Sequence, residues 1–275
     1  MKIDAWVQHP TLRFMGHEMF DSLKRWAGDA SEPQEFPISV TVAAMDAAGI
    51  DKALLTAWHG PSAGAMISNQ EVADWISEYP DRFAGMAAVN LSRPMEAVRE
   101  LRRCVTELGF VGLRMLPWLW EVPPTDRRFY PLYAECVELG VPFCTQVGHT
   151  GPLRPSETGR PIPYIDQIAI DFPELTIVCG HVGYPWTEEM IAVCRKHENV
   201  YIDTSAYTTR RLPLELVTFM RTGTGGRKVL FGSNFPMISP AAALDGIDEL
   251  GLEESTLDRY LGSTAEAVFS LGDAS

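Results

Sequence analysis

A parallel (β/α)8 barrel, built as one domain over residues 1–275, is the fold that the sequence predicts. Three observations support it. Short apolar segments recur eight times along the chain, and a segment with helical periodicity follows most of them. The segment 175–179 is apolar on both faces, which is typical of a buried parallel strand. The length of 275 residues suits such a barrel, since about 250 residues is typical.

The predicted strands and helices alternate along the chain. The strands are expected at 2–8, 52–58, 83–89, 110–116, 142–146, 175–179, 199–205 and 228–234. The helices are expected at 38–49, 69–78, 94–108, 129–139, 164–172, 187–197 and 244–271. Gly49 is a suitable helix stop, Pro94 suits a first helical turn, and Glu188 and Glu189 suit the positive end of a helix dipole. The connection 11–37 is long for a loop after a strand, so it is a candidate cover for a pocket.

Composition and charge exclude several classes of protein. Hydrophobic residues make up 46% and charged residues 21% of the chain, as in ordinary globular proteins. The formal net charge of -13 argues against nucleic acid or an anionic membrane as a partner, because phosphate groups are bound by clustered Lys and Arg. No apolar run approaches the ~20 residues that cross a bilayer, and no signal peptide is recognised, so we expect a cytoplasmic protein.

The five cysteines show no spacing that indicates a metal or disulfide framework. They lie inside predicted strands or helices and include no CxxC pair; they are Cys104, Cys136, Cys144, Cys179 and Cys194. We therefore expect reduced thiols in the core.

Polar side chains stand where the predicted strands end. His181 follows the strand 175–179, Ser205 and Asn234 end the last two strands, and Gln8 ends the first. Because the carboxyl ends of barrel strands meet at one face, these groups are expected to converge there. The simpler alternative is that each residue only caps its own loop.

Three stretches resemble the amidohydrolase-related family of the amidohydrolase superfamily, whose TIM-barrel members include aminocarboxymuconate-semialdehyde decarboxylase and related aromatic-acid decarboxylases. They are 3–10 (IDAWVQHP), 177–183 (IVCGHVG) and 229–236 (VLFGSNFP), and the similarity extends over almost the whole chain. The resemblance implies the barrel, a small-molecule substrate and a homodimer.

Members of that family usually hold a divalent metal through an HxH pair ending strand one, a His ending strand five, often a His ending strand six, and an Asp ending strand eight. At the corresponding positions this chain has Trp6 with Gln8, then Gln146, and Asn234; only His181 stands in register. Neutral amides are poor ligands for zinc, so we expect no cofactor. The alternative is one divalent metal, zinc or manganese, on His9, His149 and His181.

Candidate roles follow from side-chain chemistry. His181, with His149, is the candidate for proton transfer, because an imidazole titrates near neutral pH. Gln8, Gln146 and Asn234 are candidate neutral donors to a carbonyl or oxyanion, with Asn234 counted as catalytic.

Other side chains are candidates for contact with the substrate. Arg114 lies on an apolar strand, so it must bind a substrate carboxylate or pair with an acid such as Asp203. Trp6 and Trp118 suggest a flat ligand, and Ser205 is a further contact.

These residues predict an enzyme acting on a small carbonyl or carboxylate compound. Hydrolysis is the first expectation, because the superfamily uses it most widely. Decarboxylation of an aromatic or enol acid is the alternative, and a barrel that lost its metal and only binds a ligand is the second alternative.

Overall fold

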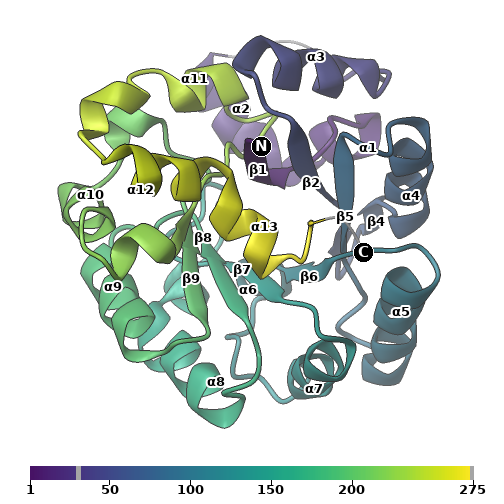
Figure 1. The fold of residues 1–275 in the computed structure, drawn as a ribbon. Helices are drawn as coiled ribbons and strands as arrows, with labels where there is room; N and C mark the ends of the chain where they lie inside the picture. The colour runs from purple at the N-terminus through teal and green to yellow at the C-terminus, as the bar shows by residue number, and fades with distance from the viewer. Residues whose placement is uncertain (29–31, 273–275) are drawn as a thin grey trace.

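Eight parallel strands form the barrel in the computed structural model, which describes residues 1–28 and 32–272 (Figure 1). They pair in the order β1-β2-β5-β6-β7-β8-β9-β10. Their bounds are β1 Ile3–Val7, β2 Lys52–Thr56, β5 Phe83–Ala87, β6 Gly112–Met115, β7 Phe143–Gln146, β8 Ile177–Gly180, β9 Val200–Asp203 and β10 Val229–Leu230. The predicted barrel is confirmed; seven predicted strands contain the observed strand, and β8 ends one residue beyond the strand predicted at 175–179.

Backbone hydrogen bonds between β1 and the chain after β10 close the sheet on itself. Ala5 N donates to Phe231 O at 2.9 Å, Asn234 N donates to Trp6 O at 2.9 Å, and Gln8 N donates to Phe235 O at 3.0 Å. The last two bonds involve residues beyond the end of β10, so they fix the segments that carry Gln8 and Asn234 next to each other.

Helices surround the barrel (Figure 1). Those between successive strands are α3 Ser39–Ala48, α4 Asn69–Glu78, α5 Pro94–Thr106, α7 Tyr130–Leu139, α8 Asp166–Asp171, α9 Thr187–Lys196 and α10 Leu214–Met220. In α5, Ala97, Leu101 and Cys104 are buried, which is the spacing of one helical face turned to the core. α4 starts with a reciprocal capping box between Ser68 and Glu71. α10 was not among the predicted helices.

The long connection after β1 is structured. It contains α1 Leu12–Met15, the 3-10 turn η1 Glu18–Phe20 and α2 Asp21–Ala27. Part of the predicted connection, residues 29–31, lies outside the described residues. A small antiparallel hairpin, β3 Trp58–Gly60 with β4 Gly64–Ile67, and the short helix α6 Pro117–Trp120 also extend beyond the barrel strands, and neither was expected.

The C-terminal region breaks the single helix predicted for 244–271. It consists of α11 Pro240–Leu244, η6 Ile247–Leu250, α12 Glu254–Asp258, η7 Arg259–Ser263 and α13 Thr264–Val268. Gly246 and Gly251 adopt left-handed backbone angles, which interrupt the helical path. Short turns elsewhere are η2 Glu157–Gly159, η3 Pro161–Ile165, η4 Thr209–Arg211 and η5 Gly225–Arg227.

The core inside the barrel is covered at its amino end by α13. Ala265 and Phe269 pack with Ile3, Ala5 and Leu54 in one buried cluster. In Figure 1, α13 lies in front of the strands, so the view is from this end. The carboxyl ends of the strands are therefore on the opposite face.

All five cysteines are buried and free, so the prediction of reduced core thiols is confirmed. In residues 1–28 and 32–272, no helix combines the length and the apolar character that crossing a membrane requires.

Candidate active site

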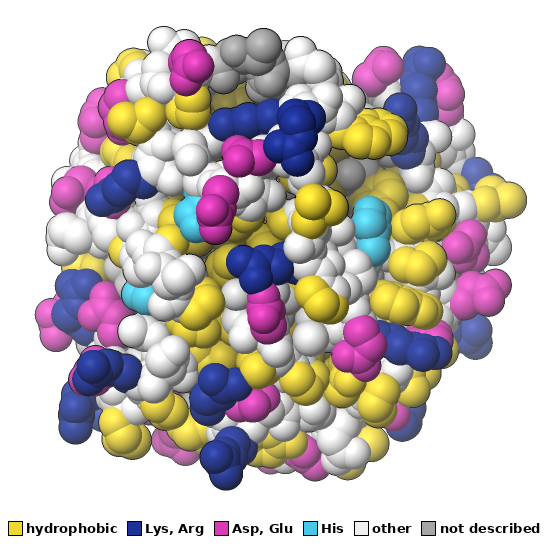
Figure 2. Space-filling model, turned by 180° about the vertical axis from the view of Figure 1, so that it is seen from behind, with side chains coloured by type: hydrophobic (Ala, Val, Ile, Leu, Met, Phe, Trp, Pro, Cys, Tyr) yellow, Lys and Arg dark blue, Asp and Glu magenta, His cyan; other side chains and the backbone are white. Residues whose placement is uncertain are grey.

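A cavity of about 490 Å³ lies at the carboxyl ends of the barrel strands. Its polar lining residues are Gln8, Lys24, Gln146, His149, His181, Tyr207 and Asn234, and Phe14, Phe20, Trp58 and Trp118 supply aromatic surface. Figure 2 shows this side of the molecule, where hydrophobic side chains gather near the centre and charged side chains of both signs surround them. The cavity suits a small flat ligand with a few polar groups.

His181 stands directly after β8 and borders the cavity. Its backbone has φ 70°, an unusual value for a non-glycine residue that here turns the chain sharply at the end of the strand. Its Nδ1 lies 2.6 Å from Ser205 Oγ, and its ring centroid lies 4.7 Å from that of Trp6. Burial lowers the pKa of His181 to about 3, with a smaller contribution from the positive charge of Arg114. The imidazole is therefore neutral at neutral pH.

Gln8 and Asn234 form a bonded pair on the cavity wall. Gln8 Nε2 donates to Asn234 Oδ1 at 3.0 Å and to Asn234 O at 3.3 Å. Gln8 Oε1 is buried and has no partner among the described residues. This acceptor is consequently left for a hydroxyl or amide donor of a ligand.

Gln146 also lines the cavity, but its polar atoms bond to the protein. Trp118 Nε1 donates to Gln146 Oε1 at 2.7 Å, and Gln146 Nε2 donates to the carbonyl of His149 at 3.0 Å. Gln146 therefore fixes the ring of Trp118 and the loop that carries His149. The side chain of His149 is exposed at the cavity edge, where its ring meets that of Tyr184 at 5.7 Å.

Trp6 and Arg114 lie beneath the cavity and do not line it. The Arg114 guanidinium lies 4.0 Å above the Trp6 ring centroid, donates to Ala5 O at 2.6 Å and also donates to the hydroxyl of Thr56. No described carboxylate lies within ion-pair distance of Arg114. Arg114 therefore forms no ion pair with Asp203, contrary to one of its two predicted roles, and its predicted contact with a substrate carboxylate stays a prediction that its place outside the cavity lining does not favour. Instead of an anion, the guanidinium contacts the ring of Trp6 in a cation–π interaction.

Trp6 is not among the residues that line the cavity, so the structure gives no support to its predicted contact with substrate. It acts through His181, whose ring it supports. A Cβ at Gly180 would lie 2.3 Å from the Trp6 ring, so glycine is required for the indole to fit inside the barrel. Ser205 is buried and likewise reaches the cavity only through His181.

Two carboxyl groups are fully buried in the same region. Asp4 Oδ1 accepts from Trp6 N at 3.1 Å and Ser233 N at 2.9 Å, and Asp203 Oδ1 accepts from Ser205 N at 2.8 Å. Burial raises the pKa of Asp4 to about 7 and raises that of Asp203 as well, although Arg114 counteracts the second shift. These carboxyls brace the turns that carry His181 and Asn234.

His9 points away from the cavity. Its Nδ1 lies 2.7 Å from Thr41 Oγ1 and its Nε2 lies 2.8 Å from Phe36 O, so both nitrogens are engaged outside the barrel mouth. Among residues 1–28 and 32–272, no group of three or more His, Cys, Asp or Glu side chains is placed to hold a metal ion. The alternative site on His9, His149 and His181 is therefore wrong.

Part of the cavity wall was missed by sequence reasoning. The segment containing α1, η1 and α2 contributes Phe14, Phe20 and Lys24. The unusual length of the connection was the signal that it covers a pocket, and the fold confirms that expectation. Nothing in its sequence pattern indicates which of its side chains face inward.

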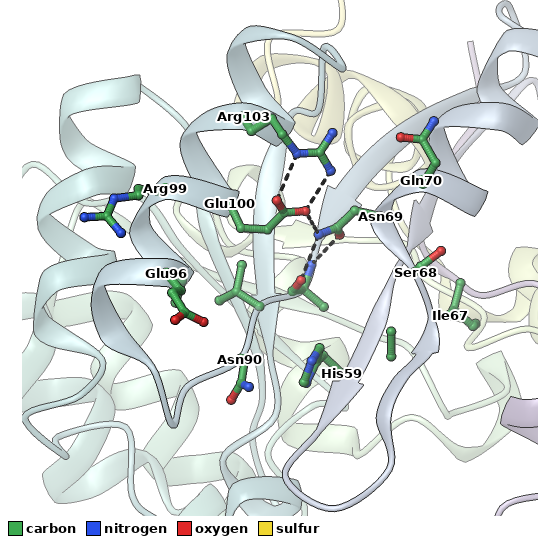
Figure 3. Close-up of a pocket in the computed structure, with 14 residues that line it drawn as sticks. His59, Ile67, Ser68, Asn69, Gln70, Asn90, Glu96, Arg99, Glu100 and Arg103 are labelled. Atoms are coloured by element: carbon green, nitrogen blue, oxygen red, sulfur yellow. Dashed lines mark hydrogen bonds and ion pairs between the residues drawn. The ribbon is translucent and has the colours of Figure 1, made fainter.

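A second cavity, of about 630 Å³, lies beside the β3–β4 hairpin and α5 (Figure 3). Several of its polar side chains bond to one another: Arg103 binds Glu100 through two nitrogens, and Asn69 binds Glu100 at 2.8 Å. It is larger than the first cavity, but His181 and Asn234 do not border it. The strand-end residues converge on the first cavity, which we take as the candidate active site.

The family model and the similar proteins point to the same family. The amidohydrolase family model matches residues 3–271. A gamma-resorcylate decarboxylase from Rhodococcus jostii is 27% identical over 256 residues, covering 74% of this chain and 75% of the relative. A 2-keto-4-carboxy-3-hexenedioate hydratase from Sphingobium sp. is 30% identical over 217 residues, covering 67% of this chain and 60% of the relative.

Solved structures share the fold over nearly the whole chain. An uncharacterized TIM-barrel protein from Bordetella bronchiseptica has a TM-score of 0.82 at 24% identity, covering 98% of both chains. A dihydroxybenzoic acid decarboxylase from Polaromonas sp., solved with bound manganese and the inhibitor 2-nitroresorcinol, has a TM-score of 0.74 at 20% identity and covers 99% of this chain and 98% of its own.

Bound manganese in similar decarboxylases contradicts the prediction of a site without a cofactor. Besides the Polaromonas structure, a 5-carboxyvanillate decarboxylase from Novosphingobium aromaticivorans is solved with manganese, with a TM-score of 0.70 at 20% identity, covering 98% of this chain and 96% of that one. These structures indicate a divalent metal in the similar enzymes. The prediction rested on the replacement of the expected ligands in this chain by Trp6, Gln8, Gln146 and Asn234.

The residues of this chain do not fit such an ion. Trp6 occupies one expected ligand position, and the amides of Gln8 and Asn234 are bonded to each other. Gln146 bonds to Trp118 and to the loop, which leaves the His181 imidazole as the one strong ligand among the five positions. No catalytic step is therefore derived through a metal.

The double variant Gln8→His with Asn234→Asp is expected to bind manganese at least about tenfold more tightly than the unchanged chain. An imidazole and a carboxylate would then replace two neutral amides beside His181, and aspartate tolerates the left-handed backbone of position 234. Calorimetric titration of chelator-treated protein measures the affinity. The Gln8→Met variant, which gains no ligand, is the control, and equal affinities for all three proteins would contradict the expectation.

Proposed function

Because the chain belongs to the amidohydrolase family, we propose that it is a non-oxidative decarboxylase of a small aromatic or enol carboxylic acid. Gamma-resorcylate decarboxylase is among its relatives, and dihydroxybenzoate and carboxyvanillate decarboxylases share its fold. A hydroxylated benzoic acid is the substrate class that these relatives suggest.

One observation carries the proposal: a neutral imidazole faces a cavity with aromatic walls. His181 lies on the cavity wall, and Trp58 and Trp118 lie nearby with ring centroids 6.4 Å apart. Aromatic side chains can pack against a flat ring whatever polar substituents it carries. The imidazole can deliver the proton that the ring carbon requires. Decarboxylation needs little else from side chains.

His181 is held for proton transfer by its neighbours. Ser205 bonds to Nδ1 and thereby orients the ring, with Trp6 beneath it. The free imidazole is neutral, because its pKa is about 3. A bound carboxylate would raise this pKa, because a nearby negative charge stabilises the imidazolium. The substrate anion and one proton therefore enter the site together.

Proton transfer to carbon and loss of carbon dioxide then follow. Imidazolium gives its proton to the ring carbon that carries the carboxylate, and the bond between this carbon and the carboxylate breaks. Carbon dioxide leaves, the electron pair of the broken bond restores the aromatic ring, and His181 returns to its neutral form. Gln8 Oε1, the unpartnered acceptor, is suited to a phenolic hydroxyl of the substrate. One proton is taken from solvent in each turnover.

Hydrolysis, the first expectation, fits less well than this alternative. The matched relatives named above are decarboxylases and a hydratase, all of which act without hydrolysing a C–N or ester bond. The family match also favours an enzyme over the second alternative, a barrel that only binds a ligand. The single domain, the homodimer and the cytoplasmic location stay predictions.

The proposal is tested by incubating the purified protein with a panel of hydroxylated benzoic acids and with their methyl esters and amides. Loss of the acid with release of one equivalent of carbon dioxide is the expected result. Hydrolysis of the esters or amides while the acids stay unchanged would contradict the proposal and restore the hydrolase expectation.

A further inference from the structure

We propose that Lys24, on the helix that covers the cavity, binds the carboxylate of the ligand. The inference deepens the proposed function and rests on it for the substrate class. Lys24 belongs to α2, in the segment between β1 and α3, and its half-buried side chain borders the candidate active site.

Lys24 supplies the positive charge in the described lining of the cavity. Among the described residues that line the cavity it is the single Lys or Arg, and no Asp or Glu lines it. The chain as a whole carries a formal net charge of -13, so acidic side chains outnumber basic ones. The described lining of this cavity has the opposite balance, with one lysine and no Asp or Glu. Arg114, the other candidate cation, lies beneath the cavity and is bonded to Ala5 and Thr56.

The ammonium group of Lys24 is positioned but not neutralised. Its Nζ donates to Met15 O at 2.6 Å, and it forms no ion pair with any carboxylate in the described part of the chain. An ammonium group carries three protons, so the bond to Met15 orients the group and leaves protons for an anion. A carboxylate is the anion that the proposed substrate brings.

The helix that carries Lys24 is tied to the opposite side of the cavity mouth. A Cβ at Gly151 would lie 3.1 Å from Leu23 Cδ2, so the residue before Lys24 packs on the loop after β7. Trp58, on the wall below, has a buried Nε1 with no partner in residues 1–28 and 32–272. A carboxylate near Lys24 would give this donor an acceptor as well.

The inference also assigns an orientation. Because His181 must reach the carbon that carries the carboxylate, the carboxylate is expected to lie between Lys24 and His181, which both border the cavity, and the rest of the ring is expected to extend toward the aromatic wall. The covering segment would then bind the carboxylate, and the barrel would supply the residue that transfers the proton.

The test compares binding of 2-hydroxybenzoate with binding of its neutral analogue 2-hydroxybenzamide, by titration calorimetry. For Lys24→Met we expect affinity for the acid to fall about tenfold, as for loss of one charged hydrogen bond, while affinity for the amide stays within about twofold. Lys24→Arg is expected to retain most of the affinity for the acid. Arg25→Met is the matched control, since Arg25 is the next residue of α2 and lines a different cavity.

Binding is measured without turnover, so the two proposals fail separately. Equal loss of acid and amide affinity in Lys24→Met, unchanged acid affinity, or no binding of either probe to the unchanged chain would overturn the role of Lys24. Lysine-dependent binding without release of carbon dioxide from any acid would support the carboxylate site and contradict the decarboxylase.

Discussion

Replacement of His181 by asparagine is expected to lower kcat about 10²–10⁴-fold, the usual contribution of a positioned acid or base. Asparagine keeps a polar side chain and tolerates the positive φ of this position, but it cannot carry a proton to carbon. KM is expected to rise as well, because the bound carboxylate loses the imidazolium that its own charge stabilises in the complex. The measurement is kcat and KM with whichever hydroxylated benzoic acid the wild-type protein decarboxylates.

His197→Asn is the matched control for that experiment. His197 bonds to Asp166 at 2.7 Å and does not border the cavity, so its loss should leave kcat unchanged. Ser205→Ala should lower kcat less than His181→Asn does, since the ring loses its orienting bond and keeps its chemistry. Unchanged turnover in His181→Asn would remove His181 from the mechanism.

Replacement of Asp4 by asparagine is expected to change how the free energy of unfolding depends on pH. Burial raises the pKa of Asp4 from 3.8 to about 7, so the folded protein binds this proton more tightly than the unfolded chain does. The resulting stability is fully present below pH 3.8 and is lost as the pH rises to about 7. At 1.36 kcal/mol per pH unit, the wild-type protein loses about 4 kcal/mol over this range.

Asparagine does not titrate, so the variant should gain about 4 kcal/mol relative to the wild-type protein between pH 4 and pH 8. Urea unfolding at a series of pH values measures the difference. Asp74→Asn, at an exposed position of α4, is the control and should follow the wild-type curve. A constant difference between Asp4→Asn and wild type across this range would show that Asp4 keeps its ordinary pKa.

Periodicity and strand ends made much of the fold predictable. The segment 175–179 is apolar on both faces, and the barrel indeed buries β8 completely. The residues that end barrel strands share one face by geometry, which is why Gln8, Gln146, His181 and Asn234 line one cavity. The C-terminal region was harder, because Gly246 and Gly251 interrupt a pattern that otherwise looks helical.

Side-chain direction is the part that the sequence did not reveal. Arg114 was expected to meet an anion, but it is satisfied by Thr56, Ala5 and the ring of Trp6, three contacts contributed by other strands. His9 directly follows Gln8 in the sequence, yet it turns toward Thr41 outside the barrel. Neighbouring residues at a strand end point in opposite directions, and a shift of one residue decides which of them reaches the site.

The covering segment shows a second limit of sequence reasoning. Its length indicates a cover, whereas the inward direction of Lys24 depends on how α2 packs on Gly151, a contact between residues far apart in the sequence. The metal is a similar case. Similar decarboxylases are solved with bound manganese, but the four altered positions of this chain carry none of the expected ligands.

Turnover in deuterium oxide tests the central claim most directly. A hydroxylated benzoic acid labelled with ¹³C at its carboxyl group is incubated with the protein, and the products are identified by NMR and mass spectrometry. We expect labelled carbon dioxide, together with a phenol that carries one deuterium at the carbon that lost the carboxylate. A product that keeps the labelled carboxyl group and gains the elements of water would contradict the claim.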